Sequence, residues 1–317
     1  TWGKLQELTD IWAARFIALG ISKGEIVTTI RDSNIDSLAM WLRLVSIGGI
    51  DATTNGEFHG RMLAYAVNNC RPALVIVAQQ YLTYLDEIAA DLETVTTVLV
   101  VDEESESATS STNLPKLISL SSLAYDIDAI SEKRIAPQWH DIACITYTSG
   151  TTGPSKAVML PWAQLNSINL ATFPYQDLDA TDVFYCFTSH AHFGAKAIPY
   201  LAAMTGGQVI IRSRFSLNSF WKDIGRFEIT TASLVGSMAD MLMHSPDSPP
   251  ENTSLRNLFM APLGPGYRQF SERFNVRIST VYNSTEGGVA VCSGWNPTNG
   301  RTVGRLRSGY PGFEVRI

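Results

Sequence analysis

Apolar side chains in the first twenty residues recur at the spacing of one helix face. They are Leu5, Leu8, Trp12, Phe16 and Leu19. Because Gly20 follows them directly, the pattern predicts a helix that ends at this glycine. Strand-like runs at residues 25–30, 50–53, 73–77 and 96–101 then alternate with amphipathic stretches at residues 36–47, 61–68 and 81–90. This alternation is typical of parallel sheets covered by helices.

The same alternation resumes after an acidic, serine-rich segment at residues 102–113, which we predict to be an exposed loop. Predicted strands follow at residues 142–147, 157–160, 183–187, 209–211, 231–235, 258–261 and 277–282. Predicted helices cover residues 162–171, 195–204, 217–227, 237–244 and 267–274. Beyond Glu286, short β segments alternate with glycine and proline turns. The predicted fold is α/β, with two helix-covered, mainly parallel sheets.

Composition narrows the function classes. The chain has 317 residues, and its 24 basic and 30 acidic side chains give a net charge of −6, which argues against nucleic acid as a partner. The four cysteines form no Cys-x-x-Cys pair, which favours a reducing compartment and a cytoplasmic localisation. No apolar run approaches the roughly 20 residues of a membrane helix, so no transmembrane segment is predicted. Small-molecule partners fit best, and a homodimer stays open.

A segment rich in hydroxyls and glycines lies between the predicted strands at residues 142–147 and 157–160. Its residues with candidate phosphate-binding roles are Thr148, Ser149, Gly150, Thr151, Thr152, Gly153 and Lys156. Glycines let backbone N–H groups turn toward one point, hydroxyls add donors, and Lys156 adds a positive charge, so the segment suits a polyphosphate. It is not a Walker loop, because a strand and not a helix follows Lys156. The alternative is an ordinary serine- and threonine-rich surface loop.

A second candidate segment closes the predicted strand at residues 277–282. It contains Tyr282, Thr285 and Glu286, and an Ala261-Pro262-Leu263 turn precedes it by about twenty residues. An aromatic face can stack on a purine, a hydroxyl can donate to a phosphoryl oxygen, and a carboxylate suits Mg²⁺. Taken alone, such a segment is more often simply the end of a strand.

Together, and in this order, the three segments resemble the signatures of the adenylate-forming (AMP-binding) superfamily, which includes acyl-CoA synthetases, peptide-synthetase adenylation domains and beetle luciferases. The resemblance implies that residues 148–153 and Lys156 bind the phosphates of ATP. It further implies that Tyr282 stacks on adenine beside Ala261 and Pro262. By the same resemblance, Thr285 bonds the α-phosphate and Glu286 holds Mg²⁺, so that Thr285, Glu286 and Lys156 form the catalytic set.

The resemblance also implies an acyl pocket. Acyl-CoA synthetases carry an aromatic residue or a histidine after the strand at residues 183–187, and counting back from Gly207 selects His192, followed by Phe193. The His190-x-His192 pair could instead bind a metal or cap the strand. The other predicted pocket residues are Val235, Gly236, Asn283 and Gly287. The small residues among them would leave volume for a ligand, although small residues also occur in ordinary turns. Asn283 stands where the family commonly has glycine, which favours a short or polar acid.

Adenylation domains carry an aspartate for the substrate ammonium in this region, and the chain has none between Asp182 and Asp223. A buried ammonium without a counter-charge is costly, which argues against an amino acid. The sequence is therefore identified as resembling the N-terminal part of an AMP-forming acid–CoA ligase of carboxylic or fatty acid metabolism, with ATP, Mg²⁺ and coenzyme A as cofactors. A carrier-loading adenylation domain and a non-catalytic nucleotide-binding relative are the alternatives.

The resemblance further implies how the chain divides into subdomains. Residues 1–55 and 181–290 would form one α/β subdomain, residues 56–180 a second with the phosphate loop, and residues 291–317 the start of a small β-barrel. The aspartate that binds the ribose and the small C-terminal domain with its catalytic lysine would follow residue 317. The chain alone is therefore expected to be impaired in adenylation.

Overall fold

The computed structural model describes residues 1–101, 113–132, 135–148, 155–247, 249, 253–300 and 303–306. By its internal contacts the chain divides into two compact units. The first unit comprises Thr1–Ala163 and Ser189–Phe193, and the second comprises Gln164–Thr188 and Gly194–Ile317. Each unit is built around its own seven-stranded sheet.

The first sheet contains β1 (Ile26–Ile30), β2 (Ile50–Thr53), β3 (Leu74–Ala78), β4 (Thr97–Val101), β5 (Lys116–Ser119), β6 (Ile142–Thr148) and β7 (Lys156–Pro161). Their order across the sheet is β5-β4-β3-β1-β2-β6-β7. All neighbours are parallel except β6 and β7, which form an antiparallel hairpin. The interior strand β3 is buried along its whole length, as expected for a parallel strand with helices on both faces.

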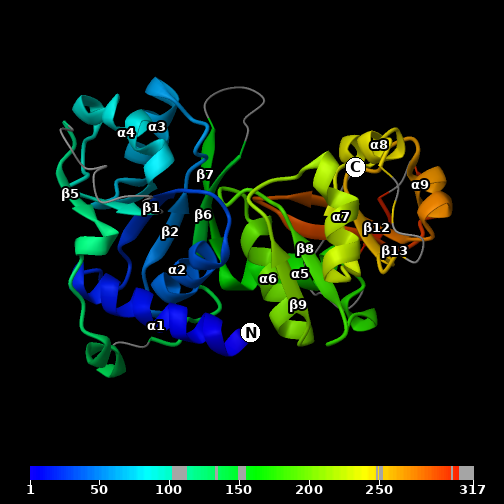
Figure 1. Cartoon of the computed structure of the whole chain (residues 1–317), viewed down its shortest axis with the longest axis horizontal. Coiled ribbons are helices and arrows are strands. Elements are labelled where there is room, and N and C mark those ends of the chain that lie inside the picture. The colour runs from blue at the N-terminus through cyan, green and yellow to red at the C-terminus, as the bar shows by residue number, and fades with distance from the viewer. Residues whose placement is uncertain are drawn as a thin grey trace. The chain divides into compact units, whose positions relative to one another are not determined.

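Helices cover both faces of the first sheet (Figure 1). The helices are α1 (Trp2–Ala18), α2 (Ile35–Ser46), α3 (Gly60–Cys70) and α4 (Leu82–Asp86). Because β2 and β3 lie on opposite sides of β1, right-handed crossovers place α2 and α3 on opposite faces. The helix α1 packs against α2, while α3 and α4 share one apolar core with β1, β3 and β4. Asn34 caps α2 through a reciprocal hydrogen bond with Ser37, which explains where this helix begins.

The second sheet contains β8 (Val183–Cys186), β9 (Gln208–Ile211), β10 (Thr231–Leu234), β11 (Asn257–Met260), β12 (Arg277–Ser284), β13 (Gly288–Trp295) and β14 (Arg305–Leu306). Their order is β14-β13-β12-β11-β10-β8-β9. The pairs β12–β13 and β13–β14 are antiparallel, and all other neighbouring pairs are parallel. The helices are α5 (Trp162–Thr172), α6 (Gly194–Thr205), α7 (Leu217–Phe227), α8 (Gly236–Met243) and α9 (Tyr267–Phe274). One face packs against α7, α8 and α9, and the other against α6 and the segment that follows α5 (Figure 1).

This architecture confirms the predicted α/β class with two helix-covered, mainly parallel sheets. The strand pairing differs from the predicted grouping of residues 1–55 with residues 181–290. The strands β1 and β2 hydrogen-bond to β3 and β6, which places residues 1–55 in the first sheet. Residues 164–180 belong to the second unit. The predicted division follows the family resemblance, whereas the observed one follows the hydrogen-bonded ladder through β1.

Two further details differ from the predicted elements. Residues 81–90 do not form one helix, because α4 covers only Leu82–Asp86 between short 3₁₀ turns. The edge strand β5 was not predicted. Residues 291–295 complete β13, and β14 extends the same sheet. The predicted β-barrel stays a prediction, because residues 301–302 and 307–317 lie outside the described residues.

The amino edge of the second sheet is held by a buried carboxylate. Asp182, 1% exposed, precedes β8 and accepts hydrogen bonds from Thr230 at 2.6 Å and from Arg256 at 2.9 Å. The Asn257 amide also donates to Asp182 at 3.3 Å. Because these partners begin β10 and β11 or directly precede them, the carboxylate fixes the amino ends of three strands. Over the described ranges, no helix combines the length and apolar character that crossing a membrane requires.

Candidate functional site

Three neighbouring parallel strands of the second sheet end at one edge. Leu234 of β10 pairs with Met260 of β11, and Phe259 of β11 pairs with Ser279 of β12. In this register, the segments after β10 and β11 lie together with the end of β12, where open α/β sheets bind their ligands. The predicted site residues found at this edge are Val235, Gly236, Ala261, Pro262, Tyr282 and Asn283.

The segments after β10 and β11 approach each other closely at two glycines. A Cβ atom on Gly236 would lie 2.8 Å from the Gly264 nitrogen and 3.0 Å from the Pro262 oxygen. Gly236 is buried at the start of α8, and Ala261 N donates to Leu234 O at 3.3 Å. The two turns therefore form one packed backbone layer beside Val235, which is 40% exposed. Gly236 was predicted to leave volume for a substrate. The space beside it is instead filled by backbone atoms of Pro262 and Gly264.

Gly236→Ala should lower the free energy of unfolding by about 1–3 kcal/mol, because the added methyl group would overlap backbone atoms that have no rotamer with which to move away. Urea unfolding of the two proteins measures the difference. Gly266→Ala is the matched control, since a Cβ there would meet only Gln269 Oε1 at 3.9 Å. Equal stability of Gly236→Ala and the wild type would contradict the close approach.

At the end of β12, Tyr282 presents its ring to solvent. Its residue is 65% exposed, although β12 is buried up to Val281. An exposed aromatic ring at a carboxyl edge offers a flat apolar surface for a planar ligand. The side-chain Oδ1 atom of the neighbouring Asn283 is buried and has no hydrogen-bond partner within the described part of the chain. A buried acceptor of this kind suits a ligand that donates a hydrogen bond.

The turn Thr285–Gly287 joins β12 to β13 and is held from two sides. The side-chain amide of Gln164 on α5 donates to the backbone oxygens of Thr285 and, at 3.1 Å, of Glu286. Ser284 Oγ accepts from Gly287 N at 2.9 Å. Hydrogen bonds to backbone atoms therefore hold the turn that carries the predicted metal ligand. The role of Gln164 was missed, because a single glutamine near the start of a helix carries no motif.

The hairpin β6–β7 in the first unit borders the predicted phosphate loop. Thr148 and Lys156 are cross-strand partners at the end where this loop joins the two strands, and Lys156 is exposed. The strand that was predicted to follow Lys156 is therefore present. The Tyr147 hydroxyl donates to Ala66 O and lies 3.1 Å from Cys70 Sγ. Burial, reinforced by Cys70, raises the pKa of Tyr147, so that its hydroxyl stays a donor and anchors the end of β6.

The predicted loop itself lies outside the described residues. This applies to Ser149, Gly150, Thr151, Thr152 and Gly153. The predicted acyl residues His192 and Phe193 lie in the segment that groups with the first unit. His192 is exposed and its ring centroid lies 4.3 Å from that of Phe193, which is 9% exposed. No metal-like arrangement supports the His-x-His alternative among the described residues.

The metal-binding side chains of the second unit fit a magnesium ion that is bound mainly by the phosphates of a nucleotide. They fit less well a metal ion that is coordinated by several protein side chains. Among the described residues there is no group of three or more histidine, cysteine, aspartate or glutamate side chains close enough to hold an ion. Glu286 is a single exposed carboxylate on the fixed turn. Magnesium commonly takes one or two carboxylates and completes its shell with phosphate oxygens and water. Glu286 would supply such a carboxylate.

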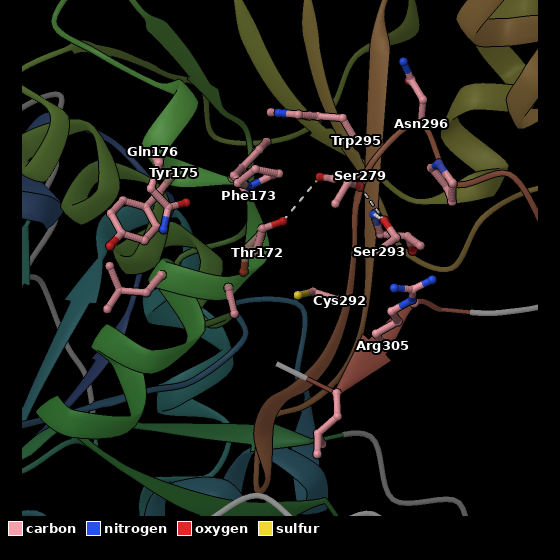
Figure 2. Close-up of a pocket in the computed structure, with 18 of the residues that line it drawn as sticks. Thr172, Phe173, Tyr175, Gln176, Ser279, Cys292, Ser293, Trp295, Asn296 and Arg305 are labelled. Carbon is pink, nitrogen blue, oxygen red and sulfur yellow. Dashed lines mark hydrogen bonds between the residues drawn. The ribbon is translucent and has the colours of Figure 1, made fainter. Parts of the chain in front are cut away.

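A cavity of about 1000 Å³ lies at the other end of the β12–β13 hairpin. Figure 2 shows Phe173, which directly follows α5, beside Ser279 and Trp295 of the hairpin. Ser279 Oγ donates to Thr172 O at 3.4 Å across one wall. None of the predicted site residues is among the described residues that line this cavity. It is therefore separate from the turn that carries Glu286.

The family model described as AMP-binding enzyme matches residues 1–317. The chain is 23% identical over 284 residues to long-chain fatty acid transport protein 6 of Mus musculus, with 85% of this chain and 43% of that protein covered. It is 26% identical over 299 residues to crotonobetaine/carnitine–CoA ligase of Proteus mirabilis, with 90% and 55% covered.

Among solved structures, the inhibitor-bound N-terminal domain of FACL13 from Mycobacterium tuberculosis superimposes with a TM-score of 0.77 at 17% identity. The match covers 92% of this chain and 71% of that one. At this identity the likeness shows the fold alone. The chain spans about half the length of the two curated relatives described above.

Proposed function

The chain belongs to the AMP-binding enzyme family over residues 1–317, and from this premise we propose that the protein containing it activates a carboxylic acid with ATP and transfers the acyl group to coenzyme A. The single observation that carries the proposal is the β12–β13 turn, where an exposed Tyr282 and a fixed Thr285-Glu286 pair stand at the carboxyl edge of a parallel sheet. The similarity to CoA ligases supports the same reaction class.

In this proposal the second unit binds the adenylate end of ATP. Tyr282 stacks on adenine beside the Ala261-Pro262 turn, and the Thr285 hydroxyl donates to the α-phosphate. Glu286 supplies one carboxylate to Mg²⁺, which neutralises phosphoryl charge when it is bound. Gln164 holds the backbone carbonyls of Thr285 and Glu286 before the nucleotide binds, which lowers the entropic cost of ordering this turn.

The first unit contributes the phosphate loop in this proposal. Residues 148–153 would supply N–H and hydroxyl donors to the polyphosphate, and Lys156 would supply a positive charge. The substrate carboxylate attacks the α-phosphorus, the bond to the β-phosphate oxygen breaks, and pyrophosphate leaves. The coenzyme A thiolate then attacks the acyl carbon and AMP leaves, so no nucleophilic side chain is needed.

We propose that the acid lacks an α-amino group. Of the two aspartates that flank the acyl segment, Asp182 is committed to the amino edge of the second sheet. Asp223 accepts hydrogen bonds from Arg212 and Tyr185. Neither carboxylate is therefore available to neutralise a substrate ammonium, which favours an acid of the acyl-CoA synthetase type over an amino acid. His192, Phe193, Val235, Asn283 and Gly287 are the proposed acyl-pocket residues.

Acid-dependent exchange of radiolabelled pyrophosphate into ATP, measured on the full-length protein, tests the proposal. We expect exchange with short or polar carboxylic acids, and thioester formation after coenzyme A is added. Exchange supported only by amino acids would instead identify a carrier-loading adenylation domain. ATP binding without pyrophosphate exchange in the presence of any acid would identify a non-catalytic relative.

A further inference from the structure

A buried polar cluster in the first unit has no role in the reaction described above. It consists of His190, Thr29 on β1 and Asp51 on β2, and each of these residues is at most 3% exposed. Thr29 Oγ1 donates to Asp51 Oδ1 at 2.8 Å and lies 3.3 Å from His190 Nε2. His190 Nε2 also lies 4.0 Å from Asp51 Oδ2. The histidine therefore contacts side chains of two neighbouring strands.

The hydroxyl of Thr29 determines the direction of these hydrogen bonds. A threonine hydroxyl has one proton, and Thr29 gives it to Asp51, so Thr29 Oγ1 accepts from His190 Nε2–H. The donors thus form a chain from His190 through Thr29 to Asp51. Hydrogen bonds that end on a charged acceptor are roughly twice as strong as neutral ones, and burial of Asp51 strengthens this chain further.

His190 belongs to a short segment with an unusual place in the chain. Ser189–Phe193 groups with the first unit, whereas the residues before and after it belong to the second. Within the segment, His192 N donates to Ser189 O at 2.9 Å, so the backbone turns tightly around His190. The position of His190 on β1 and β2 therefore sets the position of His192 and Phe193, which follow it directly.

We propose that His190 is a positioning residue, which uses Thr29 and Asp51 to hold the segment 189–193 so that His192 and Phe193 meet the acid substrate. This inference rests on the proposed function for the identity of the substrate. An apolar side chain would be less costly to bury than a histidine beside a carboxylate. Apolar contacts are not directional, however, whereas the His190–Thr29–Asp51 chain specifies one orientation.

The test uses His190→Leu, which removes the N–H donor, and His190→Gln, which keeps an N–H donor, in the full-length protein. For His190→Leu we expect amide hydrogen exchange in residues 189–193 to rise about tenfold or more, since a net hydrogen bond to a charged group is lost. The KM for the acid in pyrophosphate exchange should rise about tenfold as well, with the KM for ATP changed less than about twofold. His190→Gln should restore both values toward those of the wild type.

His140→Leu, at an exposed histidine of the same unit, is the matched control and should change neither value. Unchanged hydrogen exchange in His190→Leu would overturn the anchoring role, and equal rises in the KM for acid and for ATP would reduce it to a general structural role. If the wild type shows no pyrophosphate exchange with any acid, the proposed function fails. The proposed effect of His190 on acid binding then fails with it. Hydrogen exchange still decides the anchor in that case.

Discussion

Glu286→Gln in the full-length protein should reduce acid-dependent pyrophosphate exchange roughly 100-fold or more, because it removes the carboxylate proposed to hold Mg²⁺, and a bound metal ion contributes several kcal/mol of charge stabilisation to phosphoryl transfer. The substitution keeps the size of the side chain and removes its charge. The fold should be unaffected, since Gln164 and Ser284 hold the turn through backbone atoms and not through the Glu286 carboxylate. Exchange rates measured over a series of Mg²⁺ concentrations test this expectation, and the variant should need more Mg²⁺ for half-maximal rate.

Glu272→Gln is the matched control for this prediction. Glu272 is an exposed glutamate on α9 of the same unit, and the same loss of charge there should leave the exchange rate within about twofold of the wild type. A normal exchange rate in Glu286→Gln would refute the metal role. A variant with lost activity and a lowered unfolding temperature would instead place Glu286 among the residues that stabilise the turn.

The predictable part of this protein is the part recorded in periodic patterns and compact motifs. Strands such as β3 and β6 are largely apolar runs, and their bounds agree with the predicted ones to within a residue. The predicted positions of Tyr282 and Glu286 at the end of a strand also agree with the structure, because a sheet's carboxyl edge follows directly from where its strands end. The predicted roles of these residues stay predictions.

The rest depends on contacts between residues that are remote in the sequence. Gln164 reaches Thr285 across 121 residues, and Thr29 meets His190 across 161. Neither a lone glutamine nor a lone threonine carries a local signal, so periodicity gives no indication of such pairs. Gly236 illustrates the same limit, since its small size suggested space for a ligand and only the position of Gly264 shows that a backbone fills it. The strand pairing of residues 1–55 likewise depends on β6, far along the chain.

The stability of the second unit should depend strongly on Asp223, another long-range contact. Asp223 on α7 is 2% exposed, receives a bidentate pair of hydrogen bonds from Arg212 and accepts the hydroxyl proton of Tyr185 on β8. Asp223→Ala should lower the free energy of unfolding by about 3 kcal/mol, because it leaves the Tyr185 hydroxyl buried without an acceptor and the guanidinium without its counter-charge. Urea unfolding at neutral pH measures this loss. Asp240→Ala, at an aspartate whose side chain is 75% exposed, should change stability by less than about 0.5 kcal/mol.

The same carboxylate predicts the pH dependence of that stability. Burial alone raises the pKa of Asp223, but the hydrogen bonds from Arg212 and Tyr185 outweigh it and hold the pKa below the ordinary 3.8. A group whose pKa is lower in the folded state stabilises the fold above its unfolded pKa, and that contribution is lost as the pH falls through the folded value. The stability difference between the wild type and Asp223→Asn should therefore be constant from neutral pH to about pH 5 and shrink below about pH 4. A difference that stayed unchanged down to pH 2 would show that Asp223 acts through packing and not through its charge.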